Sequence, residues 1–243
     1  MQDAQEVTTR AVSNAEDEFR DFAYIVSHDL SGPVRSIVGF SQLLTETIDK
    51  LPNEEDRLHL ELVLESGHKL NEMIQGLLVF SRLNTVPRNP ETVDLEITLA
   101  RVHMELQSLI DMTKTQLTYP RMPEVVADAG RMFSLFYFII ENSIKFRRRD
   151  TAPDIRVFID ERATEWEFCI TDNGIGIDPM FYDDVFRPLR KLHTDEAYPG
   201  VGMGLTLARK IVIQHGGDIH IEAAPSGGTA VVFTLSKTGP AKS

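Results

Sequence analysis

The sequence predicts an α+β protein, with an N-terminal helical hairpin that forms a dimeric four-helix bundle and then an α/β sandwich. Three observations carry this prediction. Residues 1–85 show apolar residues at helical spacing and almost no strand signal. Residues 86–94 contain two prolines and are typical of a linker. Residues 95–243 alternate helical, strand-like and glycine-rich segments, so they form the second domain.

The first domain has the pattern of two long helices joined by a short connection. Val12, Phe19 and Val26 are spaced by seven residues, which is typical of a coiled-coil seam. Pro33 is expected to bend the first helix. Asn53 can cap the second helix, which carries leucines at mostly helical spacing. One hairpin cannot bury such stripes alone, so we expect a homodimer.

The second domain mixes both periodicities, as a helical layer on one face of a mixed sheet requires. The expected helices cover residues 96–111, 129–147 and 203–215, and the expected strands cover residues 116–120, the hairpin 154–172 and the segments 217–225 and 228–236.

Composition excludes several classes of function. The net charge of −12 argues against broad binding of nucleic acid or anionic membranes. The longest apolar runs are far shorter than the roughly 20 residues of a membrane span. No signal-peptide pattern is present, and the single cysteine, Cys169, fits a reducing compartment. We therefore expect a cytoplasmic segment without a membrane span.

The segment "TDNGIGI" places an acid at the end of an apolar strand. Asp172 can accept a hydrogen bond from an exocyclic amine of a ligand. Gly174 and Gly176 allow the backbone to approach that ligand closely. The same letters also describe an ordinary turn, so this motif by itself is only moderately specific.

Two further segments suit a phosphate-bearing ligand. "GVGMGL" opens a helix and places Gly200, Gly202 and Gly204 at its positive end, where backbone N–H groups can hold phosphate. Asn142 and Lys145, three residues apart on a helix, share one face. An amide oxygen can bind Mg²⁺, and a lysine can neutralise phosphate. Either segment alone would be weak evidence.

The order of these segments behind "SHDL" resembles the sensor histidine kinases of two-component systems over essentially the whole chain. The hairpin resembles their dimerisation and phosphoacceptor domain. The rest resembles the ATP-binding domain shared with type II topoisomerases, MutL and heat-shock chaperones, the GHKL type. "KFRRR" and "KLHTDEAYPGVGMGL" are most similar to the phytochrome-like group of these kinases.

This resemblance implies an ATP- and Mg²⁺-dependent protein histidine kinase. His28 matches the phosphorylated histidine, and Asp29 matches the acid taken as its general base. The phosphoryl group would pass to an aspartate of a response regulator receiver domain. The polar helical start of the chain resembles the end of a signalling helix, so we expect a sensor domain upstream in a longer protein.

The resemblance also assigns the nucleotide contacts. Asn142 would hold Mg²⁺, and Asp172 would bind the adenine amine. Residues 178–200 would form a lid over ATP. The remaining contacts would be Lys145, Gly200, Gly202 and Gly204 with the phosphates, Gly174, Gly176 and Thr229 near the adenine, and Lys191 in the lid.

Two alternatives stay open at this point. The first is a degenerate scaffold that binds nucleotide or transfers phosphate without robust autokinase activity. It is suggested by Gly32 and Phe138, because the family usually has a polar residue at each of these positions. A nucleotide-driven clamp ATPase is the other. Phe138 argues against it, because the relatives that hydrolyse ATP carry a water-activating glutamate there.

Overall fold

The computed structural model describes residues 34–35, 37–42, 54–85, 89–193, 198, 200–225 and 227–239, and the chain divides into two compact units, Met1–Val86 and Pro87–Ser243. In the first unit, α2 (Glu54–Thr85) is a continuous helix of 32 residues, and residues 34–35 and 37–42 are also helical. The expected second helix is therefore present. The predicted seam at Val12, Phe19 and Val26, the bend at Pro33 and the cap at Asn53 lie outside the described residues.

The second unit is built on a five-stranded sheet with the order β2-β4-β5-β7-β6. β2 pairs with β4 in parallel, and the other neighbours are antiparallel. This is the mixed sheet that the sequence predicts. Its strands are β2 (Gln116–Thr118), β4 (Asp154–Glu161), β5 (Glu165–Thr171), β6 (Ile219–Ala223) and β7 (Thr229–Ser236).

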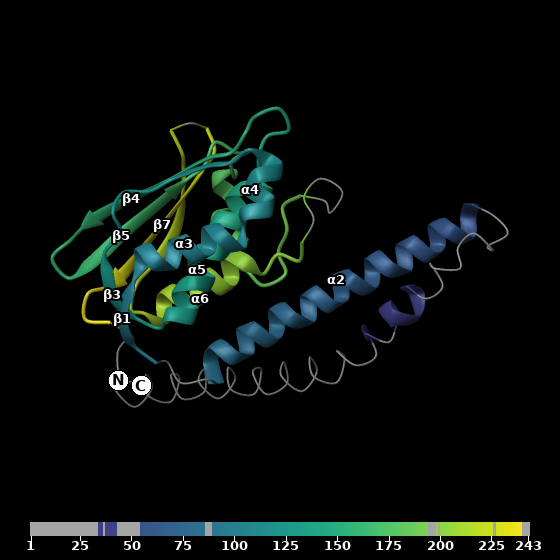
Figure 1. Ribbon diagram of the computed structural model, residues 1–243, viewed down its shortest axis with the longest axis horizontal. Helices are drawn as coiled ribbons and strands as arrows, with labels where there is room; N and C mark the ends of the chain where they lie inside the picture. The colour runs from purple at the N-terminus through teal and green to yellow at the C-terminus, as the bar shows by residue number, and fades with distance from the viewer. Residues whose placement is uncertain are drawn as a thin grey trace. The chain divides into compact units, whose positions relative to one another are not determined.

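Helices cover one face of this sheet, as Figure 1 shows. They are α3 (Leu95–Glu105), α4 (Gln107–Thr113), α5 (Ala129–Lys145) and α6 (Gly204–Gln214). Apolar residues recur along α5 every three or four positions, so one side of the helix is buried and the other remains available. The predicted α+β sandwich is confirmed.

The core lies between α5 and the central strands. Phe136 of α5 meets Phe168 of β5 edge to face at 6.0 Å and Phe233 of β7 at 5.8 Å, measured between ring centroids. All three rings are fully buried. Each contributes roughly 2 kcal/mol through burial of apolar surface. This contact fixes α5 on the sheet and therefore determines where the half-buried side of α5 points.

Two short strands were not predicted from the sequence. β1 (Glu91–Asp94) pairs antiparallel with β3 (Glu124–Ala127) as a separate two-stranded sheet. β1 lies within the segment expected to be linker, where nearby prolines hide a strand of four residues. The expected helix 96–111 is also divided at Leu106 into α3 and α4. Asp94 begins α3 by accepting a hydrogen bond from the Glu96 backbone N–H at 2.8 Å.

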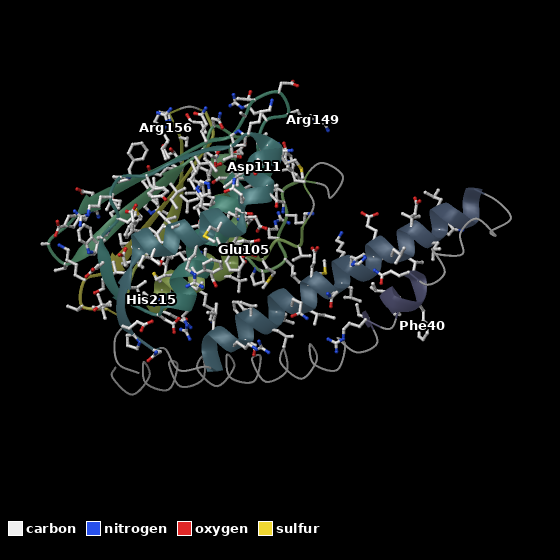
Figure 2. The ribbon with its side chains drawn as sticks, in the orientation of Figure 1. Phe40, Glu105, Asp111, Arg149, Arg156 and His215 are labelled. Atoms are coloured by element: carbon white, nitrogen blue, oxygen red, sulfur yellow. The ribbon has the colours of Figure 1, made fainter. Side chains whose placement is uncertain are left out.

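The first turn of α5 is held by a polar cluster. The Asp128 carboxylate accepts hydrogen bonds from the backbone N–H groups of Arg131 at 3.0 Å and Asn89 at 3.2 Å. The Asp128 backbone N–H donates to Nε2 of the buried His215 at 3.3 Å. His215 lies at one end of the second unit and Arg149 at the other (Figure 2). Because its ring is buried and accepts a hydrogen bond from the Asp128 backbone N–H, His215 is a structural histidine.

The outer face of the sheet is partly apolar. Phe158 of β4 is exposed and lies directly opposite Cys169 of β5. Cys169 is half-buried rather than buried, because it alternates with the core residues Phe168 and Ile170. Burial, with a smaller effect of Glu222, raises the pKa of its thiol, so Cys169 is a weak nucleophile. Within the described part of the chain, no helix is long and apolar enough to cross a bilayer.

Candidate nucleotide site

Asp172 follows the last residue of β5 and is almost completely buried. Its Oδ1 accepts hydrogen bonds from the backbone N–H groups of Gly174 at 2.8 Å and Thr229 at 3.0 Å. Burial raises the pKa of its carboxyl group, although these two hydrogen bonds, the Ser143 hydroxyl and the charge of Arg148 act in the opposite direction. A buried carboxylate held by backbone donors is a rigid acceptor for a ligand amine.

Three glycines allow the chain to close around Asp172. A Cβ atom on Gly174 would lie 2.5 Å from the Phe146 carbonyl oxygen. A Cβ atom on Gly228 would collide with the Asp172 backbone carbonyl. Gly176 has a φ of +75°, which other residues rarely adopt. Gly174 and Gly176 were predicted as site residues, whereas Gly228 was missed.

Thr229 is the first residue of β7 and is half-buried. Its carbonyl accepts a hydrogen bond from the Asp172 N–H at 2.9 Å, and its own N–H donates to the Asp172 carboxylate. The structure therefore brings together the four residues expected around the adenine, namely Asp172, Gly174, Gly176 and Thr229.

The other end of the site lies where α5 meets the start of α6. Gly204 begins α6, and a Cβ atom there would lie 3.2 Å from Nδ2 of Asn142. A Cβ atom on Gly200 would collide with Nζ of Lys145, and Gly200 has a φ of +130°. The glycine-rich segment thus passes directly over the two polar residues of α5. The structure brings Asn142, Lys145, Gly200 and Gly204 together, as predicted.

Gly202 and Lys191 were also predicted as site residues. Gly202 has a φ of +74°, and a Cβ atom there would lie 2.5 Å from the Arg190 carbonyl oxygen. Lys191 donates a hydrogen bond to the Tyr198 carbonyl at 3.4 Å. The Tyr198 ring lies 5.1 Å from the Phe146 ring, next to Lys145. Lys191 is therefore connected to Phe146 through Tyr198.

An aromatic surface borders Asn142 on the half-buried side of α5. Phe138 and Tyr137 meet edge to face at 5.8 Å, and Tyr137 stacks on Phe133 at 6.0 Å. The Tyr137 hydroxyl donates to Glu141 at 3.1 Å. Burial and the nearby Glu141 raise the pKa of Tyr137 to about 12. Glu141 is thus engaged by a tyrosine, and Phe138 supplies no carboxylate to activate water.

The donor set favours Mg²⁺ that arrives with a nucleotide. Among the described residues, no group of three or more histidine, cysteine and acidic side chains could hold a metal ion. Asn142 lies beside the glycine-rich segment, with its Nδ2 facing Gly204. It offers one amide oxygen as a ligand, which leaves coordination positions for phosphate oxygens and water. The residues present therefore fit a metal bound mainly by the ligand. His28 and Asp29 lie outside the described residues.

An α/β sandwich with a buried aspartate at one end of a site and a glycine-rich helix start at the other is the arrangement that the resemblance to ATP-binding domains of signalling kinases and ATPases implies. Residues 127–239 match the family model of histidine kinase-, DNA gyrase B- and HSP90-like ATPases. Residues 20–86, which include His28, match the His Kinase A (phospho-acceptor) domain. With both domains in this order, the chain belongs to the sensor histidine kinase family, as predicted.

Curated relatives agree with this membership. The chain is 30% identical over 223 residues to phytochrome-like protein Cph1 of Synechocystis. It is 32% identical over 227 residues to cyanobacterial phytochrome A of Nostoc. These alignments cover 92% and 93% of this chain but only 29% of each relative. The chain thus spans less than a third of the length of these relatives.

Solved structures support the fold. A structure of full-length ShkA in complex with AMPPNP has a TM-score of 0.65 at 20% identity, covering 92% of this chain and 46% of that one. The Acinetobacter baumannii histidine kinase AdeS has a TM-score of 0.59 at 20% identity, covering 84% of this chain and 97% of that one. At this level of identity the likeness concerns the fold alone.

Proposed function

We propose that this chain is the kinase core of a two-component sensor, an ATP-dependent protein histidine kinase that phosphorylates itself on His28. The observation that carries the proposal is the arrangement along α5 and its neighbours. Asp172 and Thr229 form the adenine end, and Asn142 beside Gly204 and Lys145 beside Gly200 form the phosphate end. Membership of the histidine kinase family supports the same conclusion.

The proposed reaction is a phosphoryl transfer that depends mainly on positioning. A ring nitrogen of His28 bonds to the γ-phosphorus of ATP, the bond to the bridging oxygen breaks, and ADP leaves. Asp29 accepts the ring proton. Asn142 would hold Mg²⁺, which neutralises charge on the phosphates, while Lys145 and the backbone of Gly200, Gly202 and Gly204 hold them in place.

The partners are a second copy of the chain and a receiver domain. α2 exposes apolar side chains, including Leu58 at 54% and Leu62 at 50%, which supports burial in a homodimeric four-helix bundle. The proposed domains are residues 1–85, the linker 86–94 and residues 95–243. His28 would pass its phosphoryl group to an aspartate of a response regulator. Because it consumes ATP, we place this segment in the cytoplasm.

The test is incubation with γ-labelled ATP and Mg²⁺, comparing the wild type with His28→Ala. We expect acid-labile label on the wild type alone, because a phosphoramidate hydrolyses in acid. Equal labelling of both proteins would contradict the assignment of His28. No labelling, with ATP still bound, would favour the degenerate scaffold. Phe138, which lies beside Asn142, is the residue that would explain this result. Release of free phosphate without labelling would favour a clamp ATPase.

A further inference from the structure

Arg148 joins two loops that are far apart in the sequence. It lies three residues beyond the end of α5, at the surface. Its Nε donates a hydrogen bond to the Gly174 carbonyl at 3.0 Å. Its Nη2 donates to the Gly227 carbonyl at 3.0 Å. One guanidinium group therefore connects the loop after β5 with the loop before β7.

These two loops lie on either side of Asp172. Gly174 donates its N–H to the Asp172 carboxylate, and Gly228, next to Gly227, packs directly against the Asp172 carbonyl. Arg148 thus holds the two walls that surround the buried carboxylate. Because a guanidinium group is planar and its N–H groups point in fixed directions, it sets the separation of the two carbonyls more strictly than a lysine could.

The backbone beside Arg148 reinforces this connection. The Phe146 carbonyl accepts a hydrogen bond from the Ile175 N–H at 3.0 Å. Gly227 has a φ of +83°, and a Cβ atom there would lie 3.1 Å from Nη2 of Arg148. The guanidinium group therefore sits against a glycine that leaves space for it.

The neighbouring arginines do not share this role. Nη1 of Arg147 donates to the Ile144 carbonyl at 3.4 Å, so Arg147 caps the end of α5. Arg149 is exposed and points away at the end of the second unit (Figure 2). The sequence does not distinguish the three arginines of "KFRRR" from one another. The structure separates the three residues, and Arg149 becomes a matched control for Arg148.

We infer that Arg148 is a positioning residue for the adenine end of the nucleotide site, where it holds the Gly174 and Gly227 loops at the separation that Asp172 needs. This inference rests on the proposed function. It also has an electrostatic consequence. The charge of Arg148 lowers the pKa of the Asp172 carboxyl, against the larger effect of burial. Removing that charge favours protonation of Asp172.

The experiment uses the full chain and the variants Arg148→Gln, Arg148→Lys and Arg149→Gln. ATP and GTP affinities are measured from pH 5 to pH 8 by displacement of a fluorescent nucleotide. For Arg148→Gln we expect ATP affinity to fall about tenfold, as for loss of one hydrogen bond to a charged group. We also expect smaller discrimination between ATP and GTP. As the pH is lowered, the variant should lose ATP binding at a higher pH than the wild type does.

The other variants make the result specific. Arg148→Lys should recover part of the affinity, since lysine keeps the charge but reaches only one carbonyl. Arg149→Gln should bind like the wild type. The labelling rate at saturating ATP should stay within about twofold for Arg148→Gln, because the phosphate end is untouched. Thermal unfolding checks that each variant is folded. If Arg148→Gln does not fold, the comparison of Arg148→Lys with the wild type tests the inference instead.

Unchanged ATP affinity and pH dependence in a folded Arg148→Gln protein would overturn the inference. An equal loss of affinity in Arg149→Gln would also overturn it, because the effect would then reflect net charge. Absence of ATP binding by the wild type would instead contradict the proposed function, so the two failures are distinguishable.

Discussion

The backbone N–H of Thr229 donates to the carboxylate of Asp172 at 3.0 Å across a separation of 57 residues. The Asp172 N–H donates in return to the Thr229 carbonyl. The pairing of β5 with β7 therefore continues for one more pair of residues, Asp172 and Thr229. In this pair, the Asp172 carboxylate is one of the two hydrogen-bond acceptors. This arrangement makes the adenine end of the site a continuation of the sheet, and its integrity depends on the ends of two strands.

Replacement of Asp172 by asparagine should separate binding from stability. The asparagine side chain can still accept from Gly174 and Thr229, so the fold should persist. The raised pKa of Asp172 means that ionisation costs stability in the folded state. Wild-type stability should therefore fall as pH rises above about 4 until the raised pKa is passed, and Asp172→Asn should lack this loss. Its ATP affinity should fall about tenfold or more.

Thermal unfolding between pH 4 and pH 8 and nucleotide titration at pH 7 check this prediction. At pH 7 the variant should be at least as stable as the wild type while binding ATP less tightly. A variant that is markedly less stable at pH 7, or one that binds ATP with wild-type affinity, would contradict the assigned role of Asp172.

Gly228→Ala should damage the same end of the site through sterics. Its Cβ atom would collide with the Asp172 backbone carbonyl and lie 2.5 Å from Oδ1. Because the obstacle is backbone, relief requires movement of a strand end, which costs about 1–3 kcal/mol of unfolding free energy. We expect a lower melting temperature and weakened ATP binding, measured on the same samples.

Gly130→Ala is the matched control for Gly228→Ala. A Cβ atom on Gly130 would lie 3.5 Å from Oδ1 of Asp128, which is ordinary contact. Gly130 lies in the first turn of α5, where alanine favours the helix. Stability should be equal or slightly higher and ATP affinity unchanged. If both alanine variants behaved alike, the close packing at Gly228 would not be the cause.

Asp128→Ala should lower stability without changing nucleotide binding. Asp128 caps α5 at the end opposite Asn142 and Lys145, through its hydrogen bond from the Arg131 N–H. Losing such a cap costs about 1 kcal/mol. We expect a lower melting temperature with unchanged affinity for ATP, and Asp128→Asn should retain most of the stability. A large loss of affinity would show that the two ends of α5 are coupled.

The sequence predicted the parts of the fold that have a clear period. The helix at 129–147 and the hairpin at 154–172 are observed as α5, β4 and β5 within two residues at each end. β1 and β3 have four residues each, too few for a period to be visible. Strands of this length are defined by their pairing with a segment far away in the sequence: Glu91 pairs with Ala127 and Asp94 pairs with Glu124.

The site shows the same limit. Asp172, Asn142 and the alternating glycines could be predicted because their residue types and spacing are informative locally. Gly228 and Arg148 could not, since each matters through a partner that only folding brings near. Arg148 and Gly227 are separated by 79 residues. The sequence "KFRRR" is also consistent with three solvated arginines. Only the hydrogen bonds to the carbonyls of Gly174 and Gly227 distinguish Arg148 from the other two.

Phe138→Asn should raise the rate of autophosphorylation. Phe138 borders the phosphate end, because a Cβ atom on Gly204 would lie 3.7 Å from its Cβ and 3.2 Å from Nδ2 of Asn142. An asparagine there adds a second amide beside Asn142, and amide oxygens suit Mg²⁺. We expect several-fold faster labelling of His28 and a lower Mg²⁺ requirement. Loss of the contact with Tyr137 should cost about 1 kcal/mol of stability.

Phe133→Asn is the control for Phe138→Asn. Phe133 is another half-buried aromatic residue of α5 that contacts Tyr137, but it lies more than one turn closer to the start of the helix. It should lose similar stability without faster labelling. The measurement is initial labelling with γ-labelled ATP over a range of Mg²⁺ concentrations. If Phe138→Asn labels no faster than the wild type, Phe138 does not limit the reaction, and only Gly32 still favours a degenerate scaffold.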